Sequence, residues 1–401
     1  MRKRSAIVLM LFVGFFLCAY AYCISQIKTV RYPNGKIFLE ASMNEDDKKE
    51  GLEKIYNSDG SIMAEINYKN GKRHGNEKVY YSDNQLQSDK NYDNGQLSGW
   101  ARYYSSEGWL EAEQFYAGGV REGIARSYYR NGRVKLEQPY VNGKRDGVQK
   151  AYGKTGTLLW EKQFKNDIQD GITKYYYEDS LSALDSNYSD KIKEQKEYKP
   201  GQLIAEVPYK EGKREGKAKM YDGEGNMEEE DEYKNDEWNG LTKYYDKNGH
   251  LISESFCRDG KLDGLTRNYY EDGSVESEIP YVKGLQEGMA RYYDKKGRLR
   301  SEMPYFADKR QGPARYYYED GKSELEQQYA DDKLDGMERA YYANGQLRSE
   351  KPYKNGFKEG VCKFYHENGK LKLEGVFMND SLQGTWRYYD ENGNLTKEYS
   401  Y

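Results

Sequence analysis

The chain is poor in the residues that build an ordinary hydrophobic core. Leu, Ile, Val and Phe together make up 16% of its 401 residues, which is below the roughly 20% at which a chain is suspected of disorder. Pro is also scarce, with 8 residues, whereas Tyr contributes 43 and Gly 41. Because Tyr favours strands and carries a large apolar ring, the composition predicts thin β-structure rather than disorder or a thick aliphatic core.

The chain also lacks an excess of either charge, and it contains few histidines and cysteines. The 63 basic residues face 67 acidic ones, a balance that excludes a nucleic-acid binder working by bulk charge. Three His and four Cys leave little material for a metal site or a disulfide framework. We therefore expect no nucleic-acid partner, no metal and no cofactor.

The N-terminal segment has the pattern of an export signal. A basic start, Arg2-Lys3-Arg4, precedes an apolar run from Ala6 to Ile24, and Ala19-Tyr20-Ala21 supplies the small-x-small motif of signal peptidase sites. We expect residues 1–21 to be a signal peptide. An uncleaved anchor engaging the membrane is the alternative, because this run would just span a bilayer. A lipoprotein fits less well, since no small residue precedes either early Cys. Each option exports the remaining chain to the periplasm, the cell surface or the medium.

A repeat of 24 residues fills residues 27–401. Each repeat is numbered here from a recurrent Gly at position 0. These glycines are Gly51, Gly75, Gly99, Gly123, Gly147, Gly171, Gly216, Gly240, Gly264, Gly288, Gly312, Gly336, Gly360 and Gly384. The 45 residues from Gly171 to Gly216 are interpreted as two repeats that lost three residues, with Ile192 in the place of the missing Gly. A degenerate opening copy brings the total to about 16 repeats.

The repeat columns predict a β-hairpin. Positions 8 and 9 are often Asn-Gly or Asp-Gly, as in Asn131-Gly132 and Asp272-Gly273, which is the strongest short signal for a two-residue type I′ turn. Such a turn pairs positions whose numbers sum to 17, and so places the basic position 3 opposite the acidic position 14. Turn chemistry and charge pairing thus indicate the same register. A second turn is expected at positions 19 and 20, as in Asn70-Gly71.

Stacked hairpins predict an all-β, elongated, single-layer antiparallel β-meander solenoid. Helices are disfavoured because a Gly every few residues interrupts any apolar helical period. Period-2 geometry sends positions 4, 6, 11 and 17 to one face, and the invariant Tyr of position 5 to the other with the ion pairs. About 32 strands at roughly 4.8 Å each would extend near 150 Å.

Proline gives one local expectation. Five of the eight prolines occupy position 16: Pro139, Pro208, Pro280, Pro304 and Pro352. Because proline lacks an N–H, the hairpin ladder is expected to end by position 15, and no regular pairing should run through Pro280 or Pro304.

The repeat resembles the MORN repeat, and most closely its bacterial variant form. A clear copy is Ala340-Tyr-Tyr-Ala-Asn-Gly-Gln-Leu-Arg-Ser-Glu-Lys-Pro-Tyr-Lys-Asn-Gly356, which runs on to Gly360. The resemblance implies an array of single-layer hairpins. Family members also carry antitoxin labels, or lipid-kinase labels taken from enzymes with an added kinase domain. This chain has no room for such a domain, and its export signal fits poorly with a cytoplasmic antitoxin.

No residue is singled out as catalytic, cofactor-binding or metal-binding. His74, His250 and His366 fall in three different columns, and Cys257 and Cys362 lie more than four repeats apart, so free thiols are expected. The Lys/Arg, Glu and Tyr columns recur in every copy, which favours a structural role over catalysis. The five Trp residues occupy several columns and are interpreted mainly as local packing, with glycan contact as the alternative.

The sequence favours an exported, non-catalytic repeat scaffold for protein–protein interaction at the cell envelope or outside the cell. Binding of cell-wall glycan or lipid headgroups through the sheet, or antitoxin-like inhibition of a partner, are the alternatives. Lipid is disfavoured because the chain without residues 1–21 has an acidic balance and no evident basic patch. The partner is expected to be another protein.

Overall fold

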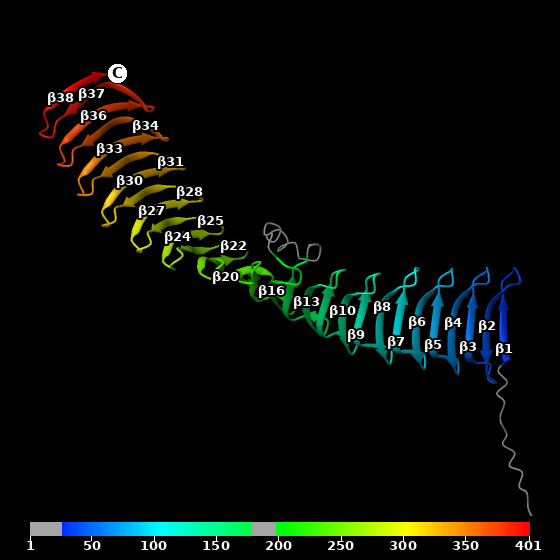
Figure 1. The fold of residues 1–401 in the computed structure, drawn as a ribbon. Coiled ribbons are helices and arrows are strands. Elements are labelled where there is room, and N and C mark those ends of the chain that lie inside the picture. Colours follow the sequence, from blue (N-terminus) through cyan, green and yellow to red (C-terminus); the bar gives the residue numbers. More distant parts are fainter. Residues whose placement is uncertain (1–25, 179–197) are drawn as a thin grey trace, which may run out of the picture. The chain divides into compact units, whose positions relative to one another are not determined.

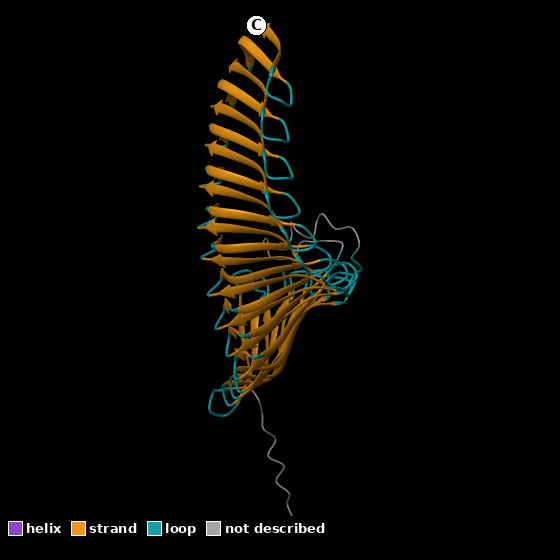
Figure 2. Ribbon diagram, turned by 90° about the vertical axis from the view of Figure 1, so that its left-hand side faces the viewer, coloured by secondary structure: helices purple, strands orange, loops and turns teal. Residues whose placement is uncertain are grey.

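A computed structural model describes residues 26–178 and 198–401. The predicted signal peptide of residues 1–21, and Ile192, lie outside the described residues. The described residues contain strands and turns and no helix (Figure 2), and thus no helix that could cross a membrane. By contacts they divide into two compact units, one ending at Gly132 and including Val141–Gly143, the other comprising Arg133–Tyr140 and Lys144–Tyr401.

The strands form one open antiparallel sheet of 38 strands, as the hairpin repeat predicts, and successive strands lie side by side in sequence order (Figure 1). The first nineteen are β1 Gln26–Arg31, β2 Ile37–Met43, β3 Lys49–Tyr56, β4 Ile62–Lys69, β5 Lys72–Tyr80, β6 Leu86–Asp93, β7 Gln96–Tyr104, β8 Leu110–Ala117, β9 Val120–Tyr128, β10 Val134–Val141, β11 Lys144–Arg145, β12 Gly147–Tyr152, β13 Leu158–Lys165, β14 Ile168–Gln169, β15 Gly171–Tyr176, β16 Leu203–Lys210, β17 Lys213–Arg214, β18 Gly216–Tyr221 and β19 Met227–Lys234. The others are β20 Glu237–Tyr245, β21 Leu251–Arg258, β22 Lys261–Leu262, β23 Gly264–Tyr269, β24 Val275–Val282, β25 Leu285–Gln286, β26 Gly288–Tyr293, β27 Leu299–Phe306, β28 Lys309–Arg310, β29 Gly312–Tyr317, β30 Ser323–Ala330, β31 Lys333–Leu334, β32 Gly336–Tyr341, β33 Leu347–Lys354, β34 Phe357–Lys358, β35 Gly360–Tyr365, β36 Leu371–Met378, β37 Ser381–Tyr389 and β38 Leu395–Ser400.

The predicted register holds through the body of each hairpin. Position 3 pairs with position 14 of the same repeat, as between Lys54 and Glu65 or between Arg291 and Glu302. The Nε atom of Arg291 lies 3.1 Å from a carboxylate oxygen of Glu302. The same strand then pairs its position 14 with position 3 of the next repeat, as between Glu65 and Lys78. Each acidic residue therefore lies between two basic ones.

The first turn differs from the predicted two-residue type I′ turn. In the repeat of Gly51, Asn57 N–H donates to the carbonyl of Ser61 and Gly60 N–H to the carbonyl of Asn57. Position 6 thus pairs with position 10 across a three-residue turn in which only the Gly has positive φ, +99° at Gly60. Asn and Asp at position 8 suit a type I turn followed by a left-handed Gly just as well.

An extra residue on the return strand cancels the effect of this longer turn on the register. Tyr56 pairs with Ile62 but Ile55 pairs with Ala64, which leaves Met63 at position 12 without a partner as a β-bulge. The type I′ turn instead occurs at positions 19 and 20. Asn70 and Gly71 there have φ of +50° and +77°.

Because of the bulge, the face expected for position 11 is wrong. Beyond it, position 11 pairs with position 5, so it lies on the face of Tyr and the ion pairs rather than with positions 4 and 17. We call this the open face. Positions 2, 4, 13, 15 and 17 form the buried face, where Ala101, Ala290 and Ala314 are fully buried. Small side chains there let the large ones of positions 4 and 17 pack, as in the cluster around Tyr175, Ala205 and Met220.

The expectation for proline is wrong. Pro280 pairs with Leu265, and the strand continues to Val282; Pro304 likewise pairs with Met289. The carbonyl of Pro280 accepts from Glu287 N–H, at 3.0 Å, so the proline nitrogen points toward the next repeat and not toward Leu265. The break in pairing therefore lies between repeats, where the φ of +113° at Gly288 requires a glycine.

The interval between Gly171 and Gly216 is one repeat and not two. β15 pairs directly with β16: Gly171 lies opposite Tyr209, and Tyr176 opposite Leu203. These are the usual partners within a single hairpin. The additional residues therefore fall, in the sequence, between Tyr176 and Leu203.

Candidate functional site: the open face of the sheet

Rows of Tyr and Glu side chains run along the open face. The hydroxyl of Tyr80 donates to a carboxylate oxygen of Glu65, in the preceding repeat, at 2.9 Å. The same bond recurs from Tyr152 to Glu137 and from Tyr269 to Glu254. Burial, and then the hydrogen bond to Glu65, raise the pKa of Tyr80 to about 12. A protonated donor bonded in this way ties neighbouring repeats together and is unsuited to general base catalysis at neutral pH.

On the buried face, cations of position 22 stack on the aromatic rings of position 17. The guanidinium of Arg310 lies 4.4 Å from the ring centroid of Tyr329, and that of Arg214 lies 4.4 Å from that of Tyr233. The backbone N–H of Arg310 donates to Asp332, which takes the Gly place of the second turn. The cations, rings and Asp side chains thus bind one another within the chain, which indicates a structural role for these rows.

The expected candidate residues remain scattered. Cys257 and Cys362 are buried free thiols, and burial raises the pKa of Cys257 to about 11, so this thiol is protonated at neutral pH. His74 and His250 each lie beside one Asp, and His366 beside a backbone carbonyl. Among residues 26–178 and 198–401, no group of three His, Cys, Asp or Glu side chains is placed to hold a metal ion.

The open face of the first unit has an aromatic anchor. Trp100 at position 1 packs edge-on against Phe115 at position 16, with ring centroids 5.6 Å apart, and remains 38% exposed. The guanidinium of Arg102 lies 5.7 Å from the Trp100 ring. Trp and Arg are the residue types that dominate binding energy at protein interfaces.

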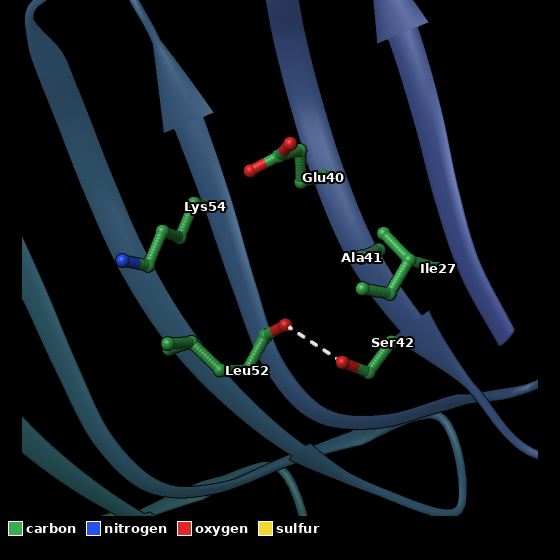
Figure 3. Close-up of a pocket in the computed structure, with 6 residues that line it drawn as sticks. All are labelled: Ile27, Glu40, Ala41, Ser42, Leu52 and Lys54. Carbon is green, nitrogen blue, oxygen red and sulfur yellow. Dashed lines mark hydrogen bonds between the residues drawn. The ribbon is translucent and has the colours of Figure 1, made fainter. Parts of the chain in front are cut away.

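A hollow of about 200 Å³ lies at the same two positions near the start of the sheet. Its apolar sides are Ile27 and Leu52, and Glu40 and Lys54 lie at one end (Figure 3). Ser42 fills little of the space between them, and its hydroxyl lies 3.5 Å from the carbonyl of Leu52. Together with Trp100, this makes the open face of the first unit uneven enough to hold protruding side chains.

The second unit carries a longer apolar surface, which we call the apolar band. Its main row consists of positions 1 and 16 on successive hairpin strands: Leu241, Phe256, Leu265, Pro280, Met289, Pro304, Pro313, Gln328, Met337, Pro352, Val361 and Val376. A second row, at positions 18 and 21, lies toward the second turns and is mixed. Its large apolar members are Val282, Leu285, Phe306, Phe357 and Met378, and its basic members are Arg258, Lys261, Lys309, Lys333 and Lys354. Phe306 is 62% exposed. An apolar surface of this length is unusual on a protein without a partner.

Comparison with known protein families shows to which family the chain belongs. The family model described as MORN repeat variant matches it ten times, over residues 49–70, 73–94, 121–142, 214–235, 238–256, 262–283, 310–331, 334–355, 358–379 and 382–401. The chain belongs to the MORN repeat variant family. The resemblance seen in the sequence is thereby confirmed, and the fold is a repeat scaffold of the kind used for binding.

Solved structures and curated proteins add little to the MORN assignment. Matches include chains of "TcdB2-TccC3-Cdc42" (12% identity over 92% of this chain, TM-score 0.16) and of a Tc holotoxin pore from Photorhabdus luminescens (11% identity over 92%, TM-score 0.15). This chain covers 23% and 25% of their lengths, and scores this low support no inference about fold or function. The search of curated proteins found no match.

The MORN motif does not indicate the apolar surface that positions 1 and 16 form on the open face. Position 1 is apolar in most repeats, but the motif does not depend on it, and only pairing across the sheet puts it beside position 16. Trp residues were interpreted mainly as local packing. This holds for Trp386, which is 4% exposed. Trp100 also packs, against Phe115, but it remains 38% exposed.

Proposed function

We propose that this protein is an exported, non-catalytic MORN scaffold that binds another protein at the cell envelope or outside the cell. The single observation that carries the binding role is the exposed Trp100–Phe115 pair with Arg102 beside it, on a sheet whose other repeated polar groups satisfy one another. Export is supported by the basic and apolar pattern of the N-terminal residues. An interface of this kind needs about 800 Å² on each partner, and a row of several repeats offers that area.

We assign the binding surface to the first unit because the row of positions 1 and 16 on its open face is uneven. In the row of positions 1 and 16, Ser42 precedes Leu52, and three Asn residues separate Leu52 from the rings of Trp100 and Phe115. Small polar side chains therefore lie between the apolar anchors. Anchors in desolvated pockets carry most of the energy of protein interfaces, and the surrounding contacts exclude water. Arg102 already pairs with Glu113, at 3.4 Å, so a partner with protruding apolar side chains fits this surface.

The test is affinity capture with the mature chain, residues 22–401, as bait on envelope fractions. A Trp100→Ala bait should lose a specific protein band by more than tenfold, since truncating a central Trp anchor costs on the order of 2 kcal/mol or more. Trp109→Ala, in the first turn of the same repeat, is the matched control and should capture as the wild type does. Circular dichroism should show both baits folded.

Two outcomes would contradict the proposal. One is capture of the same proteins by Trp100→Ala and the wild type. The other is retention of the bait by purified cell-wall glycan or lipid vesicles with no protein band, which would favour the alternative of glycan or lipid binding.

A further inference from the structure

The apolar band lies on the open face of the second unit and has a partner-sized area. Its main row extends over about twelve strands at roughly 4.8 Å each. Together with the charged positions 3 and 14 beside it, this row is about 14 Å wide, which gives about 800 Å². Leu241 is 41% exposed and Val361 49%; Pro313 is exposed, whereas Pro304 is buried. This area equals what one partner contributes to an interface of standard size, and a sheet normally buries an apolar face against another element.

A row of alternating charge borders the band. Each residue of its main row is followed or preceded, two residues away, by a charged side chain of position 3 or 14, and the signs alternate from strand to strand. In order, these are Lys243, Glu254, Arg267, Glu278, Arg291, Glu302, Arg315, Glu326, Arg339, Glu350, Lys363 and Glu374. Within the chain they form pairs such as Arg267 with Glu278, at 3.0 Å, so the row carries no net charge.

This alternation is complementary to itself in one orientation. If a second copy lies face to face with its strands in reversed order, Lys243 meets Glu374, Arg291 meets Glu326, and every other cation in the row meets a carboxylate. Aligned in the same order and register, the two rows would place like charges together. A second copy also has the same spacing between repeats, so the main row meets itself. Leu241 faces Val376, and of the apolar residues in this row only Met289 faces a polar one, Gln328.

We propose that the apolar band is the interface of a two-fold symmetric homodimer. The two sheets pack through their bands with reversed strand order, and the dyad passes between Pro304 and Pro313. Face-to-face packing of two twisted sheets is an established arrangement, and a closed two-fold contact uses the same patch on both copies. The inference goes beyond the proposed function, because it leaves Trp100 on the first unit free for a different protein.

Sedimentation equilibrium of the mature chain at micromolar concentration should give twice the mass of one chain. Met289→Lys combined with Met337→Lys puts two unpaired charges from each copy, four in all, into the centre of the interface. The dissociation constant should rise at least a hundredfold, toward monomer. The matched control is Ile252→Lys, which is 40% exposed at a bulge outside the band and should remain dimeric. A monomeric wild type, or a dimer that the double substitution leaves intact, would overturn the proposal.

A chemical cross-link tests the orientation without relying on a disruptive variant. In the reversed alignment Met289 faces Gln328 of the other copy. The double variant Met289→Cys, Gln328→Cys should be joined into covalent dimers by a short bis-maleimide. All variants carry Cys23→Ser, because the mature chain keeps this cysteine. Each single variant should give no more dimer than the Cys23→Ser chain, whose Cys257 and Cys362 are buried. Equal cross-linking of the single and double variants would rule out this dyad.

Discussion

The Tyr of position 5 shows how one residue type can join two repeats. Its ring lies on the open face and its hydroxyl donates to a Glu of the preceding repeat, as from Tyr176 to Glu161 at 3.1 Å and from Tyr365 to Glu350 at 3.1 Å. The same carboxylates pair with position 3. Each Glu is thereby held by both a hydrogen bond and an ion pair, which explains why acid at position 14 and Tyr at position 5 recur together.

These tyrosines predict a loss of stability at alkaline pH. Burial, and then contacts with Glu, raise the pKa of Tyr80, Tyr176, Tyr221, Tyr269 and Tyr365 from 10 to about 12. Because the folded state holds these protons more tightly than the unfolded chain, the contribution is complete below pH 10 and is lost as the pH rises to about 12. The urea midpoint followed by circular dichroism should fall across this window.

Replacement of these tyrosines by phenylalanine provides the control. Tyr80→Phe and Tyr269→Phe cannot ionise, so a variant with both changes should have a shallower decline between pH 10 and 12, although it is less stable at pH 7. A midpoint that stays level up to pH 12 in the wild type would contradict the hydrogen-bonded Tyr row.

At the level of the hairpin, two departures from the simplest geometry compensate each other. The three-residue first turn shifts the pairing by one, and the unpaired residue at position 12 shifts it back before position 13. The ion pairs at positions 3 and 14 thus end in the register that a two-residue turn would give. Sequence reasoning obtained the correct register from charge pairing and the wrong turn from the Asn-Gly dipeptide, because that dipeptide suits both turn types.

The bulge residue should therefore matter for its backbone and not for its side chain. Met63 has no partner in the pairing and is 37% exposed. Deleting Met63 moves the next residues to the opposite faces, which would bring Glu65 and Ile66 to the wrong sides, and should lower the free energy of unfolding by at least about 3 kcal/mol. Met63→Ala keeps the backbone and should change it by less than about 1 kcal/mol.

Urea denaturation of the Met63 deletion and of Met63→Ala distinguishes the role of the backbone from that of the side chain. Equal midpoints for the deletion and for Met63→Ala would mean that the hairpin does not need the extra residue. An unchanged slope of unfolding with urea would show that both variants still unfold as the wild type does.

For the whole molecule, the N-terminal pattern predicts processing on export. If residues 1–21 are a cleaved signal peptide, the protein recovered from the envelope or the medium should begin at Tyr22, because signal peptidase cuts after the small-x-small motif that ends at Ala21. Intact-mass measurement decides this. Ala19→Leu with Ala21→Leu should block cleavage and retain the precursor. Recovery of the wild type with its original N-terminus in the membrane fraction would instead indicate the anchor.

The sequence alone determined the repeat, its all-β hairpins and the pairing of position 3 with position 14, because periodic composition and charge are written directly in the residues. It also indicated the second turn at positions 19 and 20. These features depend on contacts between residues close in the chain or one repeat apart, where spacing is sufficient evidence.

Only the tertiary structure decided which way each side chain faces. One unpaired residue at position 12 reverses the parity of position 11, and the interval between Gly171 and Gly216 is one repeat because β15 pairs with β16. The direction of the Pro280 nitrogen and the alignment of positions 1 and 16 into an apolar band likewise depend on neighbouring strands. A one-residue shift leaves composition and period unchanged but exchanges the two faces of a sheet, so no column count could have revealed it.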